Sequence, residues 1–450
     1  MNTPICDFVD RYAKGNFLRL HMPGHKGASL LGFEHLDITE IQGADSLFAA
    51  NGIIAESERN AGSLFGAHTF YSTEGSSLCI RAMLALVMQN TPERCKKPLI
   101  LAGRNAHRSF LSAAALLDFD IEWLYPSKDE GYLSCTVDPN ELDKHLEAAV
   151  QKPAAVYLTS PDYLGHLANV REISAVCHRH GVLLLVDNAH GAYLKFLPNS
   201  LHPIDLGADL CCDSAHKTLP ALTGCAYLHV SPSHPALAEQ AKDALALFAS
   251  TSPSYLLLQS LDAVNGYLDS GYAQRISAFA KQASNRQKEL IAAGYVFEGD
   301  EPLKWTIRCD KRGYCGNEFA DLLEKNGIVC EFFDHEYCVL MLTPETETEG
   351  LERLCTALIS IPARNALPSK RLSTTRPQRV FSPREATLAP AEELPLSECA
   401  GRVLARDAVT CPPAVAIVVC GERIDEQAAA LMARYGTEKC KVILKKTAEK

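Results

Sequence analysis

The sequence predicts an α/β protein with a mostly parallel β-sheet covered by helices on both faces. From Pro98 onward, short apolar strands alternate with amphipathic helices, as they do in consecutive βαβ units. Several of these strands run directly into polar residues, and open parallel sheets bind ligands at the carboxyl ends of their strands. Beyond residue 240 the rhythm changes, which predicts a smaller α/β domain and then a small C-terminal domain.

The composition is that of a globular protein with room for two or three domains. Its 450 residues are 47% hydrophobic and 22% charged, with a formal net charge of −10. The acidic balance and the lack of a basic run argue against nucleic-acid binding. No apolar stretch approaches the roughly 18 residues that cross a bilayer, and residues 1–7 do not resemble a signal peptide. We therefore expect a cytoplasmic protein with no membrane or nucleic-acid partner.

The 17 cysteines indicate a reducing compartment rather than a disulfide framework. They are scattered, their number is odd and no two have C-x-x-C spacing. Most are expected to be small buried apolar residues. The run Cys177-His178-Arg179-His180 offers metal-binding side chains, but it lies on an amphipathic helical stretch. Surface and packing roles are therefore expected there, and no metal site is predicted.

The first quarter of the chain contains a candidate anion site. Helices are expected over 5–14 and 56–65, and the proline and glycines of the loop 20–27 break regular structure. The turn 72–77 then precedes an apolar helix over 78–88. A hydroxyl-rich turn at a helix N-terminus can bind phosphate through free N–H groups and the helix dipole. The same hydroxyls are also ordinary helix caps, so the turn alone does not decide between the two roles.

The central part of the chain supplies the parallel sheet. The expected strands cover residues 99–102, 121–124, 154–159, 182–186 and 208–212. The expected helices cover residues 109–117, 142–150 and 173–180. The polar groups that follow strand ends are His107, Asp162, Asp187 and the segment 214–217. They should lie together at one edge of the sheet, and this shared placement predicts a binding site.

Two of these strands run into an aspartate and a lysine whose combination points to a particular chemistry. One apolar strand runs into Asp187, and a later one runs into Ser214-Ala215-His216-Lys217. Pyridoxal 5′-phosphate (PLP) chemistry requires a lysine that forms a Schiff base and an aspartate that keeps the pyridine nitrogen protonated. A lysine in such a loop is more often solvated, and an aspartate there is often a turn former. His107 is likewise either a surface imidazole or a ring on which a planar cofactor stacks, so the residues alone leave both interpretations open.

The second half of the chain is less regular. Helices are expected over residues 235–248, 256–268, 276–290, 318–325 and 348–359, and strands over 304–308, 328–332 and 338–342. Six prolines punctuate the polar stretch 362–396, which is typical of a linker or of a segment wrapped over the surface. Past it, the pattern predicts a helix over 396–404, a turn over 411–414, a strand over 415–419 and a helix over 423–435.

These changes divide the chain into four expected parts. They are an N-terminal arm (1–36), a large ligand-binding domain (37–240), a small α/β domain (241–365) and a linker with a C-terminal domain (366–450).

Together the motifs resemble the Orn/Lys/Arg decarboxylase family of fold-type-I PLP enzymes, in its short bacterial form without an N-terminal wing domain. The matching segments are 21–26, 37–47, 64–67, 105–109, 187–191, 213–219, 382–386 and 401–402. They cover nearly the whole chain, and in combination they are highly specific. The resemblance implies a large PLP-binding domain of the fold-type-I transferase type over 37–240.

The resemblance also implies a role for each motif. Lys217 would form the Schiff base, Asp187 would pair with the pyridine nitrogen and His107 would stack on the ring. The remaining expected cofactor-binding residues are Ser72, Thr73, Gly75, Ser76, Ala189, His190, Ser214 and His216. Lys217 or His216 would return a proton to the product after CO₂ leaves, and the sequence does not choose between them.

The expected reaction is decarboxylation of arginine, lysine or ornithine by a homodimer or larger homo-oligomer, with the 21–26 loop serving the neighbouring subunit. The sequence does not choose among the three substrates, and Glu398 and Glu422 are the candidates for binding their second cation. Residues 411–416 read Cys-Pro-Pro-Ala-Val-Ala where the family pattern is close to Tyr-Pro-Pro-Gly-Ile-Pro. An aminotransferase or β-eliminating lyase is the runner-up, and a non-catalytic regulatory homologue is a third possibility.

Overall fold

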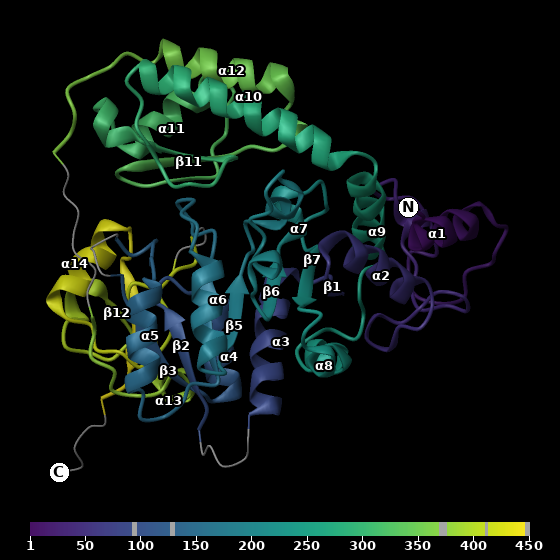
Figure 1. Ribbon diagram of the computed structural model, residues 1–450, viewed down its shortest axis with the longest axis horizontal. Helices are drawn as coiled ribbons and strands as arrows, with labels where there is room; N and C mark the ends of the chain where they lie inside the picture. The colour runs from purple at the N-terminus through teal and green to yellow at the C-terminus, as the bar shows by residue number, and fades with distance from the viewer. Residues whose placement is uncertain (92–96, 127–130, 369–375, 410–412, 446–450) are drawn as a thin grey trace.

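The computed structural model describes residues 1–91, 97–126, 131–368, 376–409 and 413–445, and a seven-stranded sheet forms its centre (Figure 1). The strands are β1 (His68–Ser72), β2 (Leu99–Gly103), β3 (Asp120–Leu124), β4 (Ala155–Thr159), β5 (Leu183–Asp187), β6 (Leu210–Asp213) and β7 (Ala226–Val230). Their spatial order is β1-β7-β6-β5-β4-β2-β3. Only β7 runs against its neighbours. The predicted α/β fold with a mostly parallel sheet is confirmed.

Helices cover both faces of this sheet. They are α3 (Gly75–Asn90), α4 (Arg108–Leu117), α5 (Pro139–Ala148), α6 (Val170–Arg179) and α8 (Pro235–Ala246). Successive strand residues point to opposite faces, so Leu185 packs with α3, α4 and α8, whereas Leu184 packs with α5 and α6. Both faces are therefore buried, which is why the parallel strands are continuously apolar.

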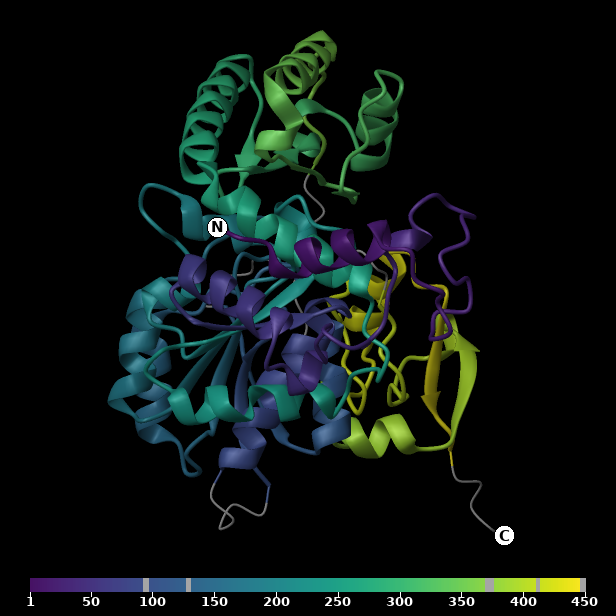
Figure 2. The ribbon, with the colours of Figure 1, turned by 90° about the vertical axis from the view of Figure 1, so that its right-hand side faces the viewer.

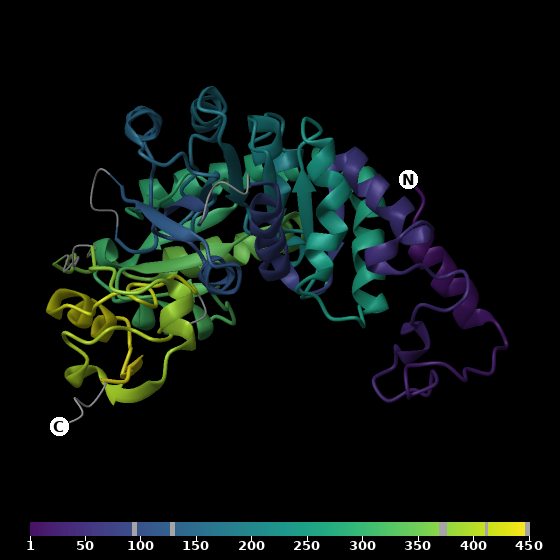
Figure 3. The same cartoon turned by 90° about the horizontal axis from the view of Figure 1, so that it is seen from below.

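The N-terminal arm begins with helix α1 (Pro4–Lys14), which packs against α2 (Ile53–Phe65) and α9 (Tyr255–Asp269) (Figure 2). The buried Asp262 carboxylate of α9 accepts hydrogen bonds from the backbone N–H groups of Ile5 and Cys6, at 2.9 and 3.0 Å. It therefore satisfies free donors of the first turn of α1. The loops after α1 project from the rest of the molecule (Figure 3).

The small domain follows the long helix α10 (Tyr272–Ala292) and lies across the carboxyl-end edge of the large sheet (Figure 1). Its sheet has the order β10-β11-β9-β8. The remaining elements are β8 (Phe297–Glu298), β9 (Lys304–Arg308), α11 (Gly316–Glu324), β10 (Phe332–Phe333), β11 (Tyr337–Met341) and α12 (Glu347–Ser360). The strand predicted over 328–332 is wrong apart from its last residue, because Val329 faces solvent and the apolar run is a loop.

The C-terminal region differs most from prediction. It contains α13 (Pro383–Leu388), β12 (Ala391–Pro395), the 3₁₀ turn η7 (Leu396–Glu398), α14 (Glu426–Arg434) and β13 (Lys439–Ile443). The stretch predicted as a linker thus holds a helix, started by a Ser382–Glu385 capping box, and a strand paired with β13. Its residues 369–375 lie outside the described residues, as do Cys411 and Pro412 of the predicted turn.

Two further predictions for this region are wrong. The helix predicted over 396–404 is only η7, and Gly401 has a positive φ of 79° that a continuing helix does not allow. Residues 415–419 form no strand; Val415 makes a single bridge to His107, and the apolar run is buried without a ladder. A short apolar run is ambiguous because burial alone does not specify a strand. Among the described helices, none combines the length and apolar character that crossing a bilayer requires.

Candidate active site

A cavity of about 200 Å³ lies at the carboxyl ends of β2, β4, β5 and β6. Three parts of the chain line it: the large domain, Glu331 of the small domain and residues 413–415 of the C-terminal region. Six of the residues singled out in the sequence line it: Ser76, His107, Asp187, Ala189, His190 and Lys217. The βαβ topology collects them, because each follows a strand end or begins the helix beside one.

Lys217 reaches the cavity because β6 ends at Asp213 and the short helix α7 (Ala215–Thr218) follows immediately. Its Nζ atom lies 3.0 Å from Nε2 of His190. Burial lowers the pKa of Lys217. The nearby Asp187 carboxylate raises this pKa, and the charge of Lys304 lowers it further, so that the net pKa is below the usual value. A lysine with a lowered pKa supplies more neutral amine at a given pH, and neutral amine is the nucleophile.

Asp187 ends β5 and is 2% exposed. Its carboxylate accepts hydrogen bonds from the Tyr157 hydroxyl at 3.1 Å and from the Ala189 N–H at 3.2 Å. The Cys212 thiol donates a third, weaker bond at 3.6 Å. A carboxylate has more acceptor capacity than these three bonds use. Asp187 therefore presents a fixed negative group to the cavity that can accept a further proton donor from a ligand.

His107 begins helix α4 and holds its ring in one tautomer. The backbone N–H of Ser109 donates to Nδ1 at 3.1 Å, so Nδ1 carries no proton and a neutral ring holds it on Nε2. Burial lowers the pKa of His107, which favours this neutral form. The ring is therefore a planar, uncharged wall of the cavity.

His190 is a second imidazole held neutral. Burial lowers its pKa well below the usual range, and the charges of Lys217 and Lys304 lower it further. Because neutral Nε2 can accept from the Lys217 amine, the other nitrogen carries the proton. That Nδ1 atom is buried and has no hydrogen-bond partner among the described residues. The same is true of Oγ1 of Thr159, which also lines the cavity.

The hydroxyl-rich turn lies between β1 and α3. The Ser214 hydroxyl donates to Ser76 Oγ at 2.8 Å, which joins the turn to the lysine-bearing segment. Ser72 instead bonds within the turn, to the carbonyl of Gly75 and the N–H of Glu74. Ser72, Thr73 and Gly75 do not line the cavity itself. Gly75 has a φ of 69°, and a side chain there would meet open space, so the helix start is open to a ligand.

Several other candidates lie away from the cavity. The ring of His216 bonds to the Cys225 carbonyl at 2.9 Å, and Asp162 bonds to His166. Glu422 is buried in an ion pair with Arg104, and Glu398 is exposed on η7. None of these four lines the cavity, whose acidic lining residues are Asp187 and Glu331. The suggestion that Glu398 or Glu422 binds a second substrate cation there has no support from this placement.

Other lining residues were not singled out from the sequence. They are Asn105, Leu133, Thr159, Pro161, Tyr163 and Glu331. Tyr163 could have been found from its place after a strand end, and its hydroxyl donates to Glu331 Oε1 at 2.9 Å. Glu331 carried no local signal, because only the packing of the small domain brings it to the cavity.

This donor set fits PLP. It combines a buried lysine of lowered pKa, an anchored aspartate, a planar neutral imidazole and a hydroxyl-bearing helix start. The two buried polar atoms without partners, on Thr159 and His190, offer further bonds to a polar ligand.

The fold is the α/β architecture of the fold-type-I class, and the residues of this site could hold PLP. The chain belongs to the Orn/Lys/Arg decarboxylase family: the family's major-domain model matches residues 3–307, and its C-terminal-domain model matches residues 368–437. The chain is accordingly an amino-acid decarboxylase, and the family resemblance predicted from the sequence is confirmed.

Individual relatives agree with this membership. The uncharacterised Bacillus subtilis protein YaaO is 29% identical, covering 96% of this chain and 94% of that protein. An arginine decarboxylase of Halalkalibacterium halodurans is 28% identical, covering 94% of this chain and 91% of that protein. The crystal structure of the Francisella novicida lysine decarboxylase LdcF has a TM-score of 0.78 at 17% identity, covering 98% of this chain and 81% of that one, and so supports the fold.

Proposed function

We propose that this protein removes the carboxyl group of a basic amino acid, with PLP as cofactor, to give the corresponding amine and CO₂. The observation that carries the proposal is the convergence of Lys217 and Asp187 on one cavity that Glu331 also lines. When bound, PLP supplies an aldehyde that a lysine amine can hold and a ring that accepts electrons from a breaking bond.

The chain's own residues would bind and orient this cofactor. Lys217 would hold the aldehyde carbon, and Asp187 would accept a hydrogen bond from the protonated ring nitrogen. His107 would cover one face of the ring and limit its movement. Ser76 and Ser214, with the first turn of α3, would bind the phosphate, and Ser72, Thr73 and Gly75 would shape that turn.

Glu331 is proposed to bind the distal cation of the substrate. Its Oε1 already accepts from Tyr163, which orients the carboxylate toward the cavity. Arginine, lysine and ornithine all carry a cationic side-chain end, and a carboxylate is its strongest partner. The acids among the described lining residues are Asp187 and Glu331, and since Asp187 is assigned to the ring nitrogen, Glu331 is the one left for the distal cation.

Lys217 is the proposed proton donor after CO₂ leaves. Its amine lines the cavity, whereas the ring of His216 is held against the Cys225 carbonyl. Neutral His190, 3.0 Å from Nζ, can accept a hydrogen bond from the ammonium form and so hold it in place.

A homodimer is also proposed, on the basis of the N-terminal arm. Phe17, Leu18, Leu20, Leu30 and Leu31 are between 60% and 86% exposed. Several large apolar side chains exposed on one arm are a feature of protein interfaces, and a second copy of the chain is the proposed partner. Light scattering should show a dimer, and Leu18→Glu with Leu20→Glu should give monomers, whereas Leu247→Glu, at a leucine 60% exposed elsewhere, should not.

A cytoplasmic location is proposed on the cysteines. Each cysteine in the described part of the chain is a free thiol, and most are buried. Free thiols persist in a reducing compartment.

The decisive experiment measures CO₂ release from the PLP-loaded protein, with arginine, lysine and ornithine offered separately. Release from one of them, abolished in Lys217→Ala, is expected. Formation of a keto acid without CO₂ would instead indicate an aminotransferase. A colourless protein that binds no PLP would exclude the proposed function altogether.

A further inference from the structure

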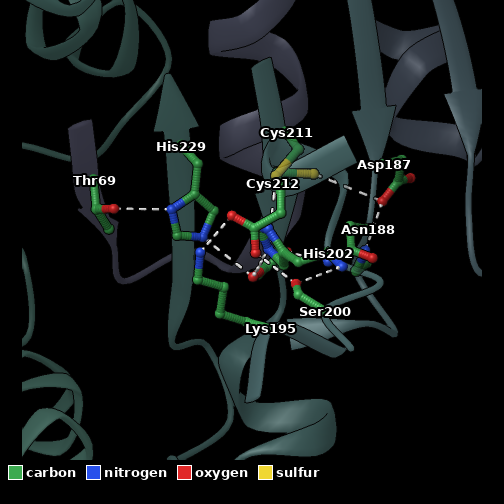
Figure 4. Close-up of polar contacts among 12 residues, drawn as sticks. Thr69, Asp187, Asn188, Lys195, Ser200, His202, Cys211, Cys212 and His229 are labelled. Atoms are coloured by element: carbon green, nitrogen blue, oxygen red, sulfur yellow. Dashed lines mark hydrogen bonds and ion pairs between the residues drawn. The ribbon is translucent and has the colours of Figure 1, made fainter. Parts of the chain in front are cut away.

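Four side chains converge in the interior: His202, Cys211, Asp213 and His229. Figure 4 labels His202, Cys211 and His229 of this cluster. All four are fully buried. One oxygen of Asp213, Oδ2, lies 3.0 Å from Nε2 of His202 and 3.1 Å from Nε2 of His229. None of the four lines the cavity, and none has a role in the reaction proposed above.

The hydrogen-bond roles in this cluster follow from the chemistry of the groups. An ionised carboxylate only accepts, so each imidazole must donate from Nε2. The outer nitrogen of His229 then accepts from the Thr69 hydroxyl at 2.9 Å. Burial raises the pKa of Asp213, but the two imidazoles outweigh it and hold this pKa well below the usual range. Asp213 is therefore a buried anion with ordered donors.

The ligand-type atoms of the cluster lie within 4.8 Å of one another, which is the spacing of a possible zinc site. The contacts between Asp213 Oδ2 and the two imidazoles have hydrogen-bond lengths, and the N–H protons occupy the positions that a metal would need. The hydrogen-bonded arrangement is the one the geometry favours.

The other oxygen of Asp213 connects this anion to the active site. Oδ1 accepts a hydrogen bond of 2.6 Å from Nδ2 of Asn188, and Asn188 directly follows Asp187. Asp213 itself directly precedes the segment that carries Lys217. One side-chain hydrogen bond thus ties together the ends of β5 and β6, at the two residues next to the cofactor-binding groups.

Asn188 has little freedom to move. It is fully buried, its backbone N–H donates to the Cys212 carbonyl, and a side chain on Gly191 would come within 2.0 Å of its Oδ1 atom. The contacts of Asn188 therefore hold the donor of the Asn188–Asp213 hydrogen bond in place, and the two imidazoles hold its acceptor, Asp213, in place.

We infer that Asp213 is a positioning residue, which sets the distance and angle between Asp187 and Lys217 through its hydrogen bond to Asn188. The inference rests on the proposed function, because it assigns a purpose to the spacing of two cofactor-binding groups. Misplacement of such groups by about 1 Å commonly costs on the order of 100-fold in rate.

The test compares Asn188→Ala with Thr69→Val in the full-length protein. Asn188→Ala removes the link and leaves Asp213 and both imidazoles in place. Thr69→Val removes a hydrogen bond at the far side of the same cluster and leaves the link. For each protein, PLP affinity, the absorption maximum of the lysine-bound cofactor at fixed pH and the melting temperature are measured.

Asn188→Ala should weaken PLP binding by about tenfold or more and shift the absorption maximum. Losses of this size are seen at metal sites when a residue that hydrogen-bonds to a direct ligand is removed. Thr69→Val should change only the melting temperature. Asp213→Asn, which presents an N–H donor to groups that are themselves donors, should match Asn188→Ala in the two cofactor measurements. If it does not fold, Asn188→Ala decides alone.

Equal PLP affinity and spectra in Asn188→Ala and the wild type would overturn the inference and leave the proposed function intact. A wild-type protein that binds no PLP would overturn both. About one zinc ion per chain in the purified protein would overturn the inference by replacing the hydrogen-bonded cluster with a metal site.

Discussion

Arg104 and Glu422 form a buried ion pair, with Nη2 of the arginine 2.8 Å from Oε2 of the glutamate and side chains that are 5% and 4% exposed. The same Nη2 atom donates to the Ile417 carbonyl at 3.0 Å. Arg104 follows β2, whereas Glu422 belongs to the C-terminal region and comes after the cavity-lining residues 413–415 in the chain. The pair therefore holds the C-terminal region against the large domain at the site.

Glu422→Ala should lower the free energy of unfolding by about 3–5 kcal/mol, because it leaves the Arg104 guanidinium buried without a counter-charge. Urea denaturation measures the change. The control is Asp120→Ala, which breaks an exposed pair of 2.6 Å between Asp120 and Arg379 that joins the same two regions. Its expected cost is below about 1 kcal/mol. Equal losses in the free energy of unfolding for the two variants would show that the Arg104–Glu422 pair does not hold the C-terminal region in place.

Ala414 occupies the left-handed region, with a φ of 56°, where the family pattern has glycine. A side chain in this region costs roughly 1–2 kcal/mol, and glycine there costs about 0.5–1 kcal/mol in backbone entropy. Ala414→Gly should therefore raise the free energy of unfolding by about 0.5–1 kcal/mol. The control is Ala416→Gly, in the same segment but without a positive φ, which should lower the free energy of unfolding. A lower free energy of unfolding in both variants would refute the strain argument.

His166 should make stability depend on pH. Its ring lies 2.9 Å from Asp162 and 3.6 Å from Glu298. Burial lowers the pKa of His166, but the hydrogen bonds to the two carboxylates outweigh this and raise it to about 10. Since the folded pKa exceeds the unfolded value of about 6.5, the stabilisation is complete below pH ~6.5 and is lost as the pH rises to ~10.

The measurement compares His166→Gln with the wild type by denaturation at pH 6 and at pH 10. The difference in free energy of unfolding should be on the order of 2 kcal/mol at the lower pH and should shrink at the higher one, since solvent partly screens the pair. A difference that does not change with pH would show that the ring acts by packing alone.

Glu331→Gln should raise KM for the basic amino acid and lower kcat/KM by roughly 10- to 100-fold, the value of a lost hydrogen bond to a charged group. The amide can still accept from Tyr163, so the loop should keep its conformation. PLP affinity should not change. Glu324→Gln, an exposed acid on α11, serves as the matched control. Unchanged kinetics in Glu331→Gln would require another partner for the distal cation.

The sequence by itself determined the fold class and the edge of the sheet at which the site lies. Strand and helix periods are local properties, and a parallel sheet places all its strand ends on one side. Asp187, His107 and Lys217 could therefore be singled out from their places after strand ends. The strands β1 and β7 escaped notice because their apolar pattern is broken by the polar residues Thr69 and His229, which pair with each other in the interior.

Only the tertiary structure decided which groups complete the cavity and which do not. Glu331 faces it because the small domain folds over the sheet, whereas the Glu422 carboxylate is taken by Arg104. The C-terminal region misled prediction because its apolar runs are buried against other domains rather than paired in ladders. Contacts between distant parts of the chain depend on packing and charge pairing in three dimensions, which local sequence patterns do not encode.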